Sequence, residues 1–430
     1  MASLALRGEI VSFDDDPRTS VRALRHCADG LVVVRDGCIA QCGDATSLLP
    51  TLAPDTAVLD HRGRLILPGF IDAHIHYPQT DVLASPGEAL LGWLERYTFP
   101  AERAFGDPQH ARNTAGFFLD ELLRNGTTTA AVFPTVHAHS VDALFEAAAA
   151  RRMRIACGKV LMDRNCPDFL RDSAESGYEE SKVLIARWHG KGRAVYAVTP
   201  RYAASSSPEQ LASAGRLVAE HPGVLMQTHI AENRDEVAWV RELFPGARNY
   251  LDVYDGAGLV GIRSLFAHGI WLDDAERARL ARARGSIAFC PGSNFFLGSG
   301  CFSYAKAHAA RVGVGLGTDI GAGTSFSQLA TMREAYKAAR LLGESFSALD
   351  AFYLATLGAA RALTMEGEIG SISPGREADL VVLDPAATPL LARRTARAES
   401  LEEKLFALMI LGDDRAVAET YVLGEKLRHR

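Results

Sequence analysis

The fold is best predicted from one stretch, LPGFIDAHIH at residues 67–76, an apolar run that ends in two histidines one residue apart. Along a β-strand, residues i and i+2 point to the same side, so His74 and His76 would share one face while Ile75 packs on the other. Similar β-prone runs follow along the chain, at 127–133, 154–161, 194–200, 223–230, 264–270, 286–291 and 312–319.

Helical segments rich in Ala, Leu, Glu and Arg lie between these runs, and the clearest are at 107–125, 141–152, 207–220 and 273–284. Strands that alternate with helices form parallel sheets through right-handed crossovers. The repeated unit therefore predicts an α/β fold, a (β/α)₈ TIM barrel that spans residues 68–369.

The two ends of the chain have a different pattern. The segments LALRGEIVSF near the start and GSISPGREADLVVLD from Gly370 alternate apolar and polar residues and are punctuated by Gly and Asp. We therefore predict a second, small β-sandwich domain formed from both chain termini, residues 1–67 and 370–430.

Composition limits the classes of function. The chain has 430 residues, of which 48% are hydrophobic and 23% charged, which is typical of a globular protein. Its 46 basic and 52 acidic residues give a net charge of −6, so nothing favours a nucleic-acid partner. The 7 cysteines are scattered and form no C-x-x-C pair, which predicts free thiols in a reducing compartment. With no secretory signal and no apolar run long enough to span a membrane, we expect a cytoplasmic protein and no membrane partner.

Reactive side chains recur at the ends of the predicted strands. The first run ends in His74 and His76, the fifth has His229 with Glu232 three residues on, the sixth holds His268, and the eighth ends in Asp319. Barrel active sites lie where the strands end. Two imidazoles from one strand, another imidazole and a carboxylate suit Zn²⁺ or Fe²⁺, and an unligated Glu232 could move protons.

Taken singly, each of these residues also fits a structural role, since a histidine can be an ordinary strand residue and Asp319 could cap a turn. Their shared position at strand ends favours the metal site. We expect His137 and His139 to be loop residues, and the other histidines to face solvent: His26, His61, His110, His189, His221, His308 and His429. The nucleophile elbow, the phosphate loop and the H-x-E…P-C-x-x-C signature are absent from the sequence.

The sequence Pro68–His76 resembles the opening signature of the amidohydrolase superfamily. The resemblance continues through Gln227-Thr228-His229, Ala267-His268-Gly269 and Gly317-Thr318-Asp319, and covers nearly the whole chain. It implies a barrel hydrolase that uses a metal-activated water.

Finer motifs resemble the guanine deaminase family within that superfamily. They are His76-Tyr77-Pro78-Gln79, Trp93-Leu94 with Tyr97-Thr98-Phe99-Pro100-Ala101-Glu102, Thr199-Pro200-Arg201-Tyr202, His229-Ile230-Ala231-Glu232-Asn233 and Cys290-Pro291-Gly292-Ser293-Asn294. Tyr202 stands where that family often has Phe, and Gly292 where we expect Thr, a change that we interpret as one of loop backbone only.

This resemblance implies a role for each matching residue. The metal ligands would be His74, His76, His229 and Asp319; the catalytic groups Glu232, Asp319 and His268; and the substrate contacts Gln79, Trp93, Arg201, Tyr202, Glu232 and His268. The implied reaction is hydrolysis of guanine to xanthine and ammonia, and the implied assembly is a homodimer.

We expect one metal ion per chain, Zn²⁺, with Fe²⁺ as the alternative. Superfamily members with two metals often use a carboxylated lysine at the end of the fourth strand, where this chain has Arg201, and Lys159 comes before its strand end. Two other functions stay open at this point: deamination of another heterocycle, such as a triazine, a pterin or an adenosine-like compound, and a metal-free scaffold without catalysis.

Overall fold

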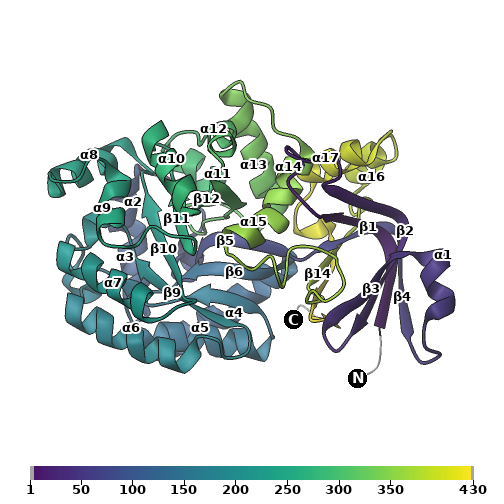
Figure 1. Ribbon diagram of the computed structural model, residues 1–430, viewed down its shortest axis with the longest axis horizontal. Helices are drawn as coiled ribbons and strands as arrows, with labels where there is room; N and C mark the ends of the chain where they lie inside the picture. The colour runs from purple at the N-terminus through teal and green to yellow at the C-terminus, as the bar shows by residue number, and fades with distance from the viewer. Residues whose placement is uncertain (1–3, 428–430) are drawn as a thin grey trace.

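The larger sheet is a barrel of parallel strands in a computed structural model that describes residues 4–427 (Figure 1). In hydrogen-bonded order, its strands are β5 (Phe70–His76), β6 (Thr127–Phe133), β7 (Arg154–Cys157), β9 (Ala194–Pro200), β10 (Leu225–Ile230), β11 (Ser264–His268), β12 (Ser286–Phe289) and β13 (Gly313–Leu316), and the short β8 (Val160–Leu161) pairs with β9. The chain after β13 closes the barrel, since Asp319 N donates to His74 O at 2.9 Å and His76 N to Ile320 O at 3.0 Å. The predicted (β/α)₈ barrel is confirmed.

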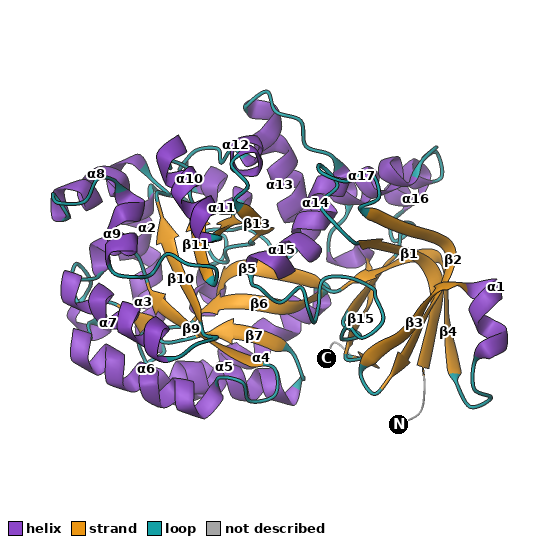
Figure 2. Cartoon of the chain, viewed as in Figure 1, coloured by secondary structure: helices purple, strands orange, loops and turns teal. Residues whose placement is uncertain are grey.

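Helices surround this sheet (Figure 2). They are α4 (Pro108–Arg124), α5 (Ala138–Ala150), α6 (Ala174–Trp188), α7 (Pro208–Glu220), α8 (Arg234–Leu243), α9 (Tyr250–Gly256), α10 (Asp274–Ala283), α11 (Pro291–Phe296), α12 (Tyr304–Ala309), α13 (Gln328–Leu341), α14 (Ala348–Leu354) and α15 (Leu357–Ala362). Three of the predicted helices begin directly after a capping side chain, since Asp107, Ser207 and Asp273 each accept a hydrogen bond from a backbone amide of the first turn.

A series of short helical turns leads from β5 to α4 and covers the strand ends. It comprises η2 (Tyr77–Val82), α2 (Leu90–Trp93), the π-turn η3 (Leu94–Thr98) and α3 (Phe99–Ala104). Other single turns along the chain are η1 (Leu49–Thr51), η4 (Asp168–Leu170), η5 (Ala203–Ser205) and η6 (Asp414–Ala416). We refer to residues 77–104 as the covering segment.

A second sheet takes strands from both ends of the chain, as predicted (Figure 1). Its order is β16 (Glu425–Lys426), β15 (Val417–Val422), β14 (Leu380–Leu383), β4 (Ala57–Pro68), β1 (Leu4–Phe13), β2 (Leu24–Arg35) and β3 (Cys38–Asp44), with α1 (Ala45–Leu48) after β3. One face buries an apolar cluster that includes Leu6, Val32, Ile66 and Leu380. The division of the chain at residues 68 and 369 stays a prediction.

Two features of the chain differ from the expected pattern. The run at 67–76 is split at Gly69, because Leu67 and Pro68 end β4 and pair with β14 of the smaller sheet. The C-terminal segment also contains two helices, α16 (Pro389–Thr395) and α17 (Leu401–Leu411). Helix α17 packs on α13, where the rings of Tyr336 and Phe406 lie 5.1 Å apart.

Two of the histidines outside the barrel mouth depart clearly from the predictions. Four others that were expected to face solvent are only partly exposed: His110, His189, His221 and His308. His61 is buried, at 4% exposure, and its Nε2 lies 3.1 Å from the hydroxyl of Tyr421 on the adjacent sheet, so its predicted exposure is wrong. His139 lies in α5 rather than in a loop, because that helix begins at Ala138 with His137 as its N-cap. His26 is exposed, and His429 lies outside the described residues.

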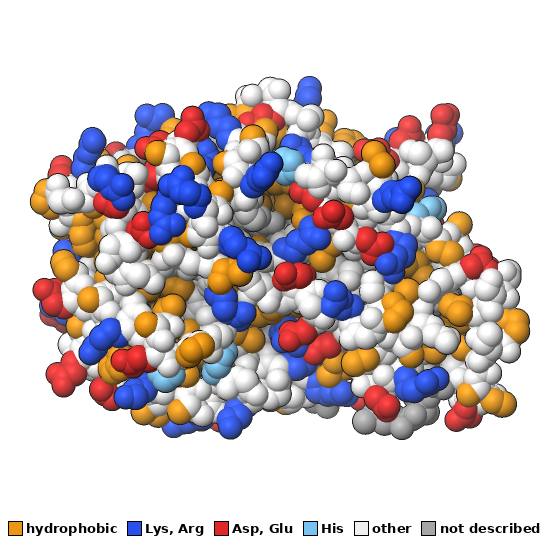
Figure 3. Space-filling view, viewed as in Figure 1, with side chains coloured by type: hydrophobic (Ala, Val, Ile, Leu, Met, Phe, Trp, Pro, Cys, Tyr) orange, Lys and Arg blue, Asp and Glu red, His pale blue; other side chains and the backbone are white. Residues whose placement is uncertain are grey.

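The surface and the cysteines give no sign of a membrane span or of cross-linking within residues 4–427. Figure 3 shows basic and acidic side chains interspersed over the face in view, without a continuous basic area on that face. No helix in this range is both long and apolar enough to cross a bilayer. All of the cysteines are free thiols.

Candidate active site

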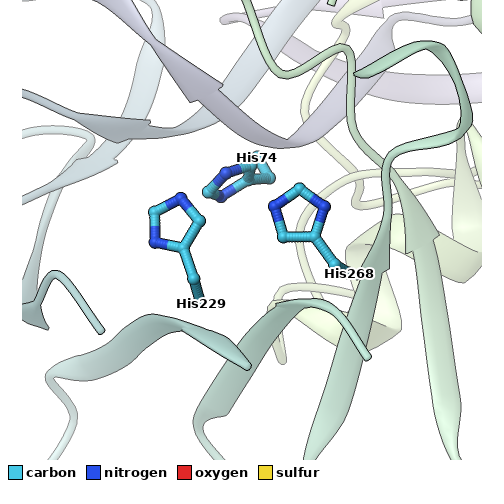
Figure 4. Close-up of side chains that lie close together, drawn as sticks. All are labelled: His74, His229 and His268. Carbon is cyan, nitrogen blue, oxygen red and sulfur yellow. The ribbon is translucent and has the colours of Figure 1, made fainter. Parts of the chain in front are cut away.

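The predicted ligands converge at the mouth of the barrel. His74 and His76 end β5, His229 lies in β10, His268 ends β11, and Asp319 follows β13. The Nε2 atom of His76 lies 3.2 Å from Nε2 of His74 and 3.1 Å from Nε2 of His229. Oδ1 of Asp319 lies 3.2 Å from Nε2 of His74 and 3.4 Å from Nε2 of His76. Figure 4 shows the rings of His74, His229 and His268 arranged around a common centre.

The proton positions on these rings favour a metal. Nδ1 of His229 lies 2.7 Å from the backbone oxygen of Arg201, which can only accept, so Nδ1 carries the proton and Nε2 keeps a lone pair. Nδ1 of His268 lies 2.9 Å from Oδ1 of Asn294, and its Nε2 has no hydrogen-bond partner among residues 4–427. The lone pairs on Nε2 of His229 and His268 are therefore available to a metal ion.

Burial controls the charges of this cluster. It lowers the pKa of His74 and His229, and that of His76 to about 3, which favours the neutral form of these three imidazoles. Burial alone would raise the pKa of Asp319, but the neighbouring His74 and His76 hold it well below its usual range. The result is a set of neutral nitrogens with one carboxylate.

This donor set fits a transition-metal ion. With bonds of 2.0–2.1 Å, the ligands of a tetrahedral Zn²⁺ lie about 3.4 Å apart, close to the separations in this cluster. The potential ligand atoms of His74, His76 and Asp319 all lie within 4.8 Å of one another. The cluster also contains a thiol that sequence analysis did not single out, since Sγ of Cys290 lies within the same distance of ligand atoms of His268 and Asp319.

Asp72 holds the backbone of two segments that carry the cluster. Its Oδ1 accepts from Thr318 N at 3.0 Å and from His74 N at 3.2 Å, which ties the end of β5 to the chain that carries Asp319. Asp72 is completely buried, and burial raises its pKa to about 7. Asp72 thus holds the backbone of His74, whereas Asp319 lies beside its imidazole.

Glu232 lies beside the cluster but is not one of the closely spaced ligand atoms. Its Oε2 is 3.4 Å from Nε2 of His268, and its backbone N donates to Oε2 of Glu236 at 2.9 Å. Burial and the nearby negative charge of Asp319 raise the pKa of Glu232 well above its usual value. A carboxyl group in this environment can hold a proton at neutral pH and release it during a reaction.

A cavity joins this cluster to the predicted substrate contacts. Its walls include Gln79, Trp93, Arg201 and Tyr202 together with Glu232. Oε1 of Gln79 accepts from Gly321 N at 3.2 Å, which leaves the amide nitrogen of Gln79 as a donor for a ligand. The predicted substrate contacts and the histidine and carboxylate cluster therefore line one cavity.

Arg201 has a buried partner that sequence analysis did not assign. Its Nη1 donates to Oε1 of Glu102 on α3 at 2.6 Å. Arginines that follow strands often pair with a carboxylate at the exposed rim of a barrel. This pair is instead buried, and its arginine lines the cavity. The covering segment also supplies wall residues that were not foreseen, namely Leu90, Leu94 and Thr98.

Lys159 lies in a separate ion pair. Its Nζ is 2.5 Å from Oδ2 of Asp172, and the lysine is 1% exposed. Lys159 directly precedes β8 and is engaged with Asp172, while Arg201 follows β9. A bridging carboxylated lysine thus has no candidate at either position.

Comparisons with known proteins agree with this geometry. The sequence profile of the Amidohydrolase family matches residues 65–427. The chain is 50% identical over 429 residues to a protein of Escherichia coli (strain K12) named guanine deaminase, and the match covers 99% of this chain and 98% of that one. The solved structure titled E. coli Guanine Deaminase superposes with a TM-score of 0.96 at 48% identity and covers 100% of both chains.

A third comparison includes a ligand. The crystal structure titled guanine deaminase from C. acetobutylicum with bound guanine in the active site superposes with a TM-score of 0.89 at 30% identity. The match covers 99% of this chain and 100% of the other.

Proposed function

The chain belongs to the amidohydrolase family, and on that premise we propose that it is a hydrolase of C–N bonds that converts guanine to xanthine and ammonia. One observation carries the proposal: the histidine and carboxylate cluster opens into the same cavity as Gln79, Arg201 and the aromatic rings of Trp93 and Tyr202. The likeness to guanine deaminases over the full chain supports it.

His74, His76, His229 and Asp319 would hold one metal ion, for which we propose Zn²⁺ with Fe²⁺ as the alternative. When bound, Zn²⁺ acts as a Lewis acid that lowers the pKa of a water molecule to about 7. The donor set and the lowered pKa values of His74, His76 and His229 support this assignment.

The protein groups would divide the proton transfers between them. Asp319 accepts a proton from the water that attacks C2 of guanine, and His268 hydrogen-bonds that water. Glu232 would donate a proton to the adjacent ring nitrogen, take up the remaining proton of the hydroxyl group on C2, and pass it to the amino group, which leaves as ammonia. The proton held by Asp319 would then restore the protonated form of Glu232. Its raised pKa suits a group that both gives and takes a proton.

The walls of the cavity would orient the base. The guanidinium of Arg201 has only donors, which matches the C6 oxygen of guanine and not the C6 amino group of adenine. Gln79 offers a further hydrogen bond, and Trp93 and Tyr202 offer apolar ring surfaces.

A panel of purines tests the function. The purified protein is assayed for ammonia release with guanine, adenine and adenosine, and the conversion of guanine to xanthine is followed by absorbance. Guanine should be deaminated, and adenine and adenosine should be inert because they lack the 2-amino group. Deamination of adenine or of a triazine in preference to guanine would contradict the proposal, and absence of bound metal would favour the scaffold alternative.

We further propose a place and an assembly for this enzyme: a cytoplasmic homodimer that acts in purine catabolism. Free thiols at all cysteines suit a reducing compartment. Light scattering of the purified protein tests the dimer, which would have twice the 46.4 kDa mass of one chain.

A further inference from the structure

The ion pair between Arg201 and Glu102 stands out because both groups are removed from solvent. The side chain of Arg201 is 3% exposed and that of Glu102 is 0% exposed, with 2.6 Å between Nη1 and Oε1. Arg201 follows β9 in the barrel, whereas Glu102 comes from the covering segment, 99 residues earlier in the chain. The pair therefore joins the barrel to the segment that covers its mouth.

Helix α3 holds the guanidinium from two sides. Phe99 and Glu102 are three residues apart on this helix and so lie on the same face. The centre of the Phe99 ring lies 5.7 Å from the central carbon of the guanidinium. The carboxylate of Glu102 accepts a hydrogen bond from Nη1 of the same guanidinium. The remaining N–H groups of Arg201 are left for the cavity that this residue lines.

Glu102 has no other polar contact that would account for its burial. Its second oxygen, Oε2, has no hydrogen-bond partner among residues 4–427. Burial raises the pKa of this carboxyl group, and Arg201 opposes that shift. A buried ion pair is an inefficient way to stabilise a fold, because apolar residues of similar volume often do so equally well.

We propose that Glu102 is a positioning residue that holds the guanidinium of Arg201 toward the C6 oxygen of the purine, and that it thereby contributes to selectivity for 6-oxopurines. This inference rests on the proposed function, since it assigns a role to Glu102 within the same cavity. An unheld arginine side chain has several rotatable bonds, so without Glu102 the donors would face the ligand only part of the time.

The test compares two ligands that differ at C6 and, as a consequence, at N1, which carries a proton in hypoxanthine and none in purine. This difference at N1 is the same for the wild type and the variants. Hypoxanthine carries an oxygen at C6 and purine carries a hydrogen, and neither has the 2-amino group, so the proposed reaction turns over neither of them. Calorimetry measures the Kd of both ligands for the metal-loaded enzyme in the wild type, Glu102→Gln and Glu102→Asp. The ratio of the two Kd values does not depend on the fraction of active protein.

A matched control is Asp350→Asn. Asp350 is also a buried carboxylate paired with an arginine, Arg18, at 2.7 Å, but it caps α14 away from the cavity. Its substitution should leave the Kd ratio unchanged. A general loss of packing would affect the control and the Glu102 variants alike, whereas a positioning role affects only the latter.

We expect Glu102→Gln to reduce the preference for hypoxanthine over purine by about 10- to 100-fold, the range for hydrogen bonds to charged groups. The preference of Glu102→Asp should lie between those of Glu102→Gln and the wild type, because the carboxylate on the shorter side chain can still approach Arg201. KM for guanine should rise in parallel, with a smaller change in kcat.

An unchanged Kd ratio in Glu102→Gln would overturn the inference. Loss of the folded protein in both Glu102 variants would overturn it as well, because the pair would then belong to the fold. Failure of the proposed function is a separate outcome: the wild type would not release ammonia from guanine, whatever the Kd ratios of the variants.

Discussion

At the scale of single residues, Glu232 is the clearest test of the mechanism. Replacement of its carboxyl group in Glu232→Gln removes the proton carrier but keeps the shape of the side chain. We expect kcat for guanine to fall by roughly 100-fold or more. Because Glu232 is not among the proposed ligands, elemental analysis should find the normal metal content.

Glu209→Gln is the control for this substitution, since Glu209 is an exposed glutamate in the first turn of α7. It should match the wild type in both assays. Near-normal turnover by Glu232→Gln would mean that this buried carboxyl group has only a structural role and would exclude the proposed proton transfer.

His229 tests the metal site itself. Its Nδ1 is fixed by the backbone of Arg201, so His229→Ala removes a nitrogen whose lone pair is already oriented. We expect the variant to lose both metal and guanine turnover while circular dichroism shows a folded barrel.

The exposed His26 provides the comparison, and His26→Ala should retain metal and activity. A metal content of one ion per chain in His229→Ala would remove this histidine from the ligand set.

Sequence alone predicted the clustered residues because strand ends in a barrel meet at one rim, whatever their separation along the chain. His74 and Asp319 are brought together in this way. Glu102 could not be assigned by that logic, because it lies in irregular turns whose path over the barrel depends on packing. His61 was misjudged for a related reason, since its burial depends on Tyr421 at the other end of the chain.

At the scale of elements, the loop after β13 must follow a narrow path to place Asp319. A Cβ atom on Gly323 would lie 1.7 Å from the backbone oxygen of Thr318 and 2.8 Å from that of Asp319. Gly323→Ala must therefore displace the ligand-bearing backbone. A displacement of about 1 Å can cost about 100-fold in rate, so we expect kcat to fall at least tenfold.

Gly292→Ala is the corresponding control. Gly292 lies in the first turn of α11 and not in a loop, and a Cβ atom there would meet nothing within 4 Å. Because alanine favours helices, this substitution should leave kcat unchanged and add up to about 1 kcal/mol of stability. Equal activity of the two variants would show that the loop tolerates the displacement.

The regular elements were predictable from the sequence to different degrees. Strands β5 to β13 are short apolar runs between turn residues, and the structure has a strand in each of the predicted runs. Helix α5 begins before its prediction because His137 caps it without a typical capping side chain. The covering segment could not be predicted, since its turns are too short to show a helical period.

At the scale of the whole molecule, the two ends of the barrel carry different groups of polar residues. The strand ends at the mouth carry the candidate site, whereas the opposite end carries a buried network of charges. Arg154 begins β7 and Arg193 precedes β9, and both donate to Glu377 in the segment before β14. This network connects the barrel to the sheet built from the chain termini, far along each strand from the metal cluster.

The final prediction is that this network stabilises the molecule without affecting catalysis. Arg193 donates to Asp379 at 2.6 Å and to the backbone oxygen of Arg152 at 2.7 Å, and its side chain is 10% exposed. Arg193→Met would leave the carboxylates of Glu377 and Asp379 short of a partner, and breaking such a buried pair costs about 3 kcal/mol. Denaturant unfolding should show that loss, while kcat and KM for guanine stay at wild-type values.

Arg62→Met removes the exposed pair with Asp60 on the smaller sheet and should change neither the stability nor the kinetic constants. A fall in kcat in Arg193→Met would mean that the two ends of the barrel are coupled, and that the position of the smaller sheet reaches the active site.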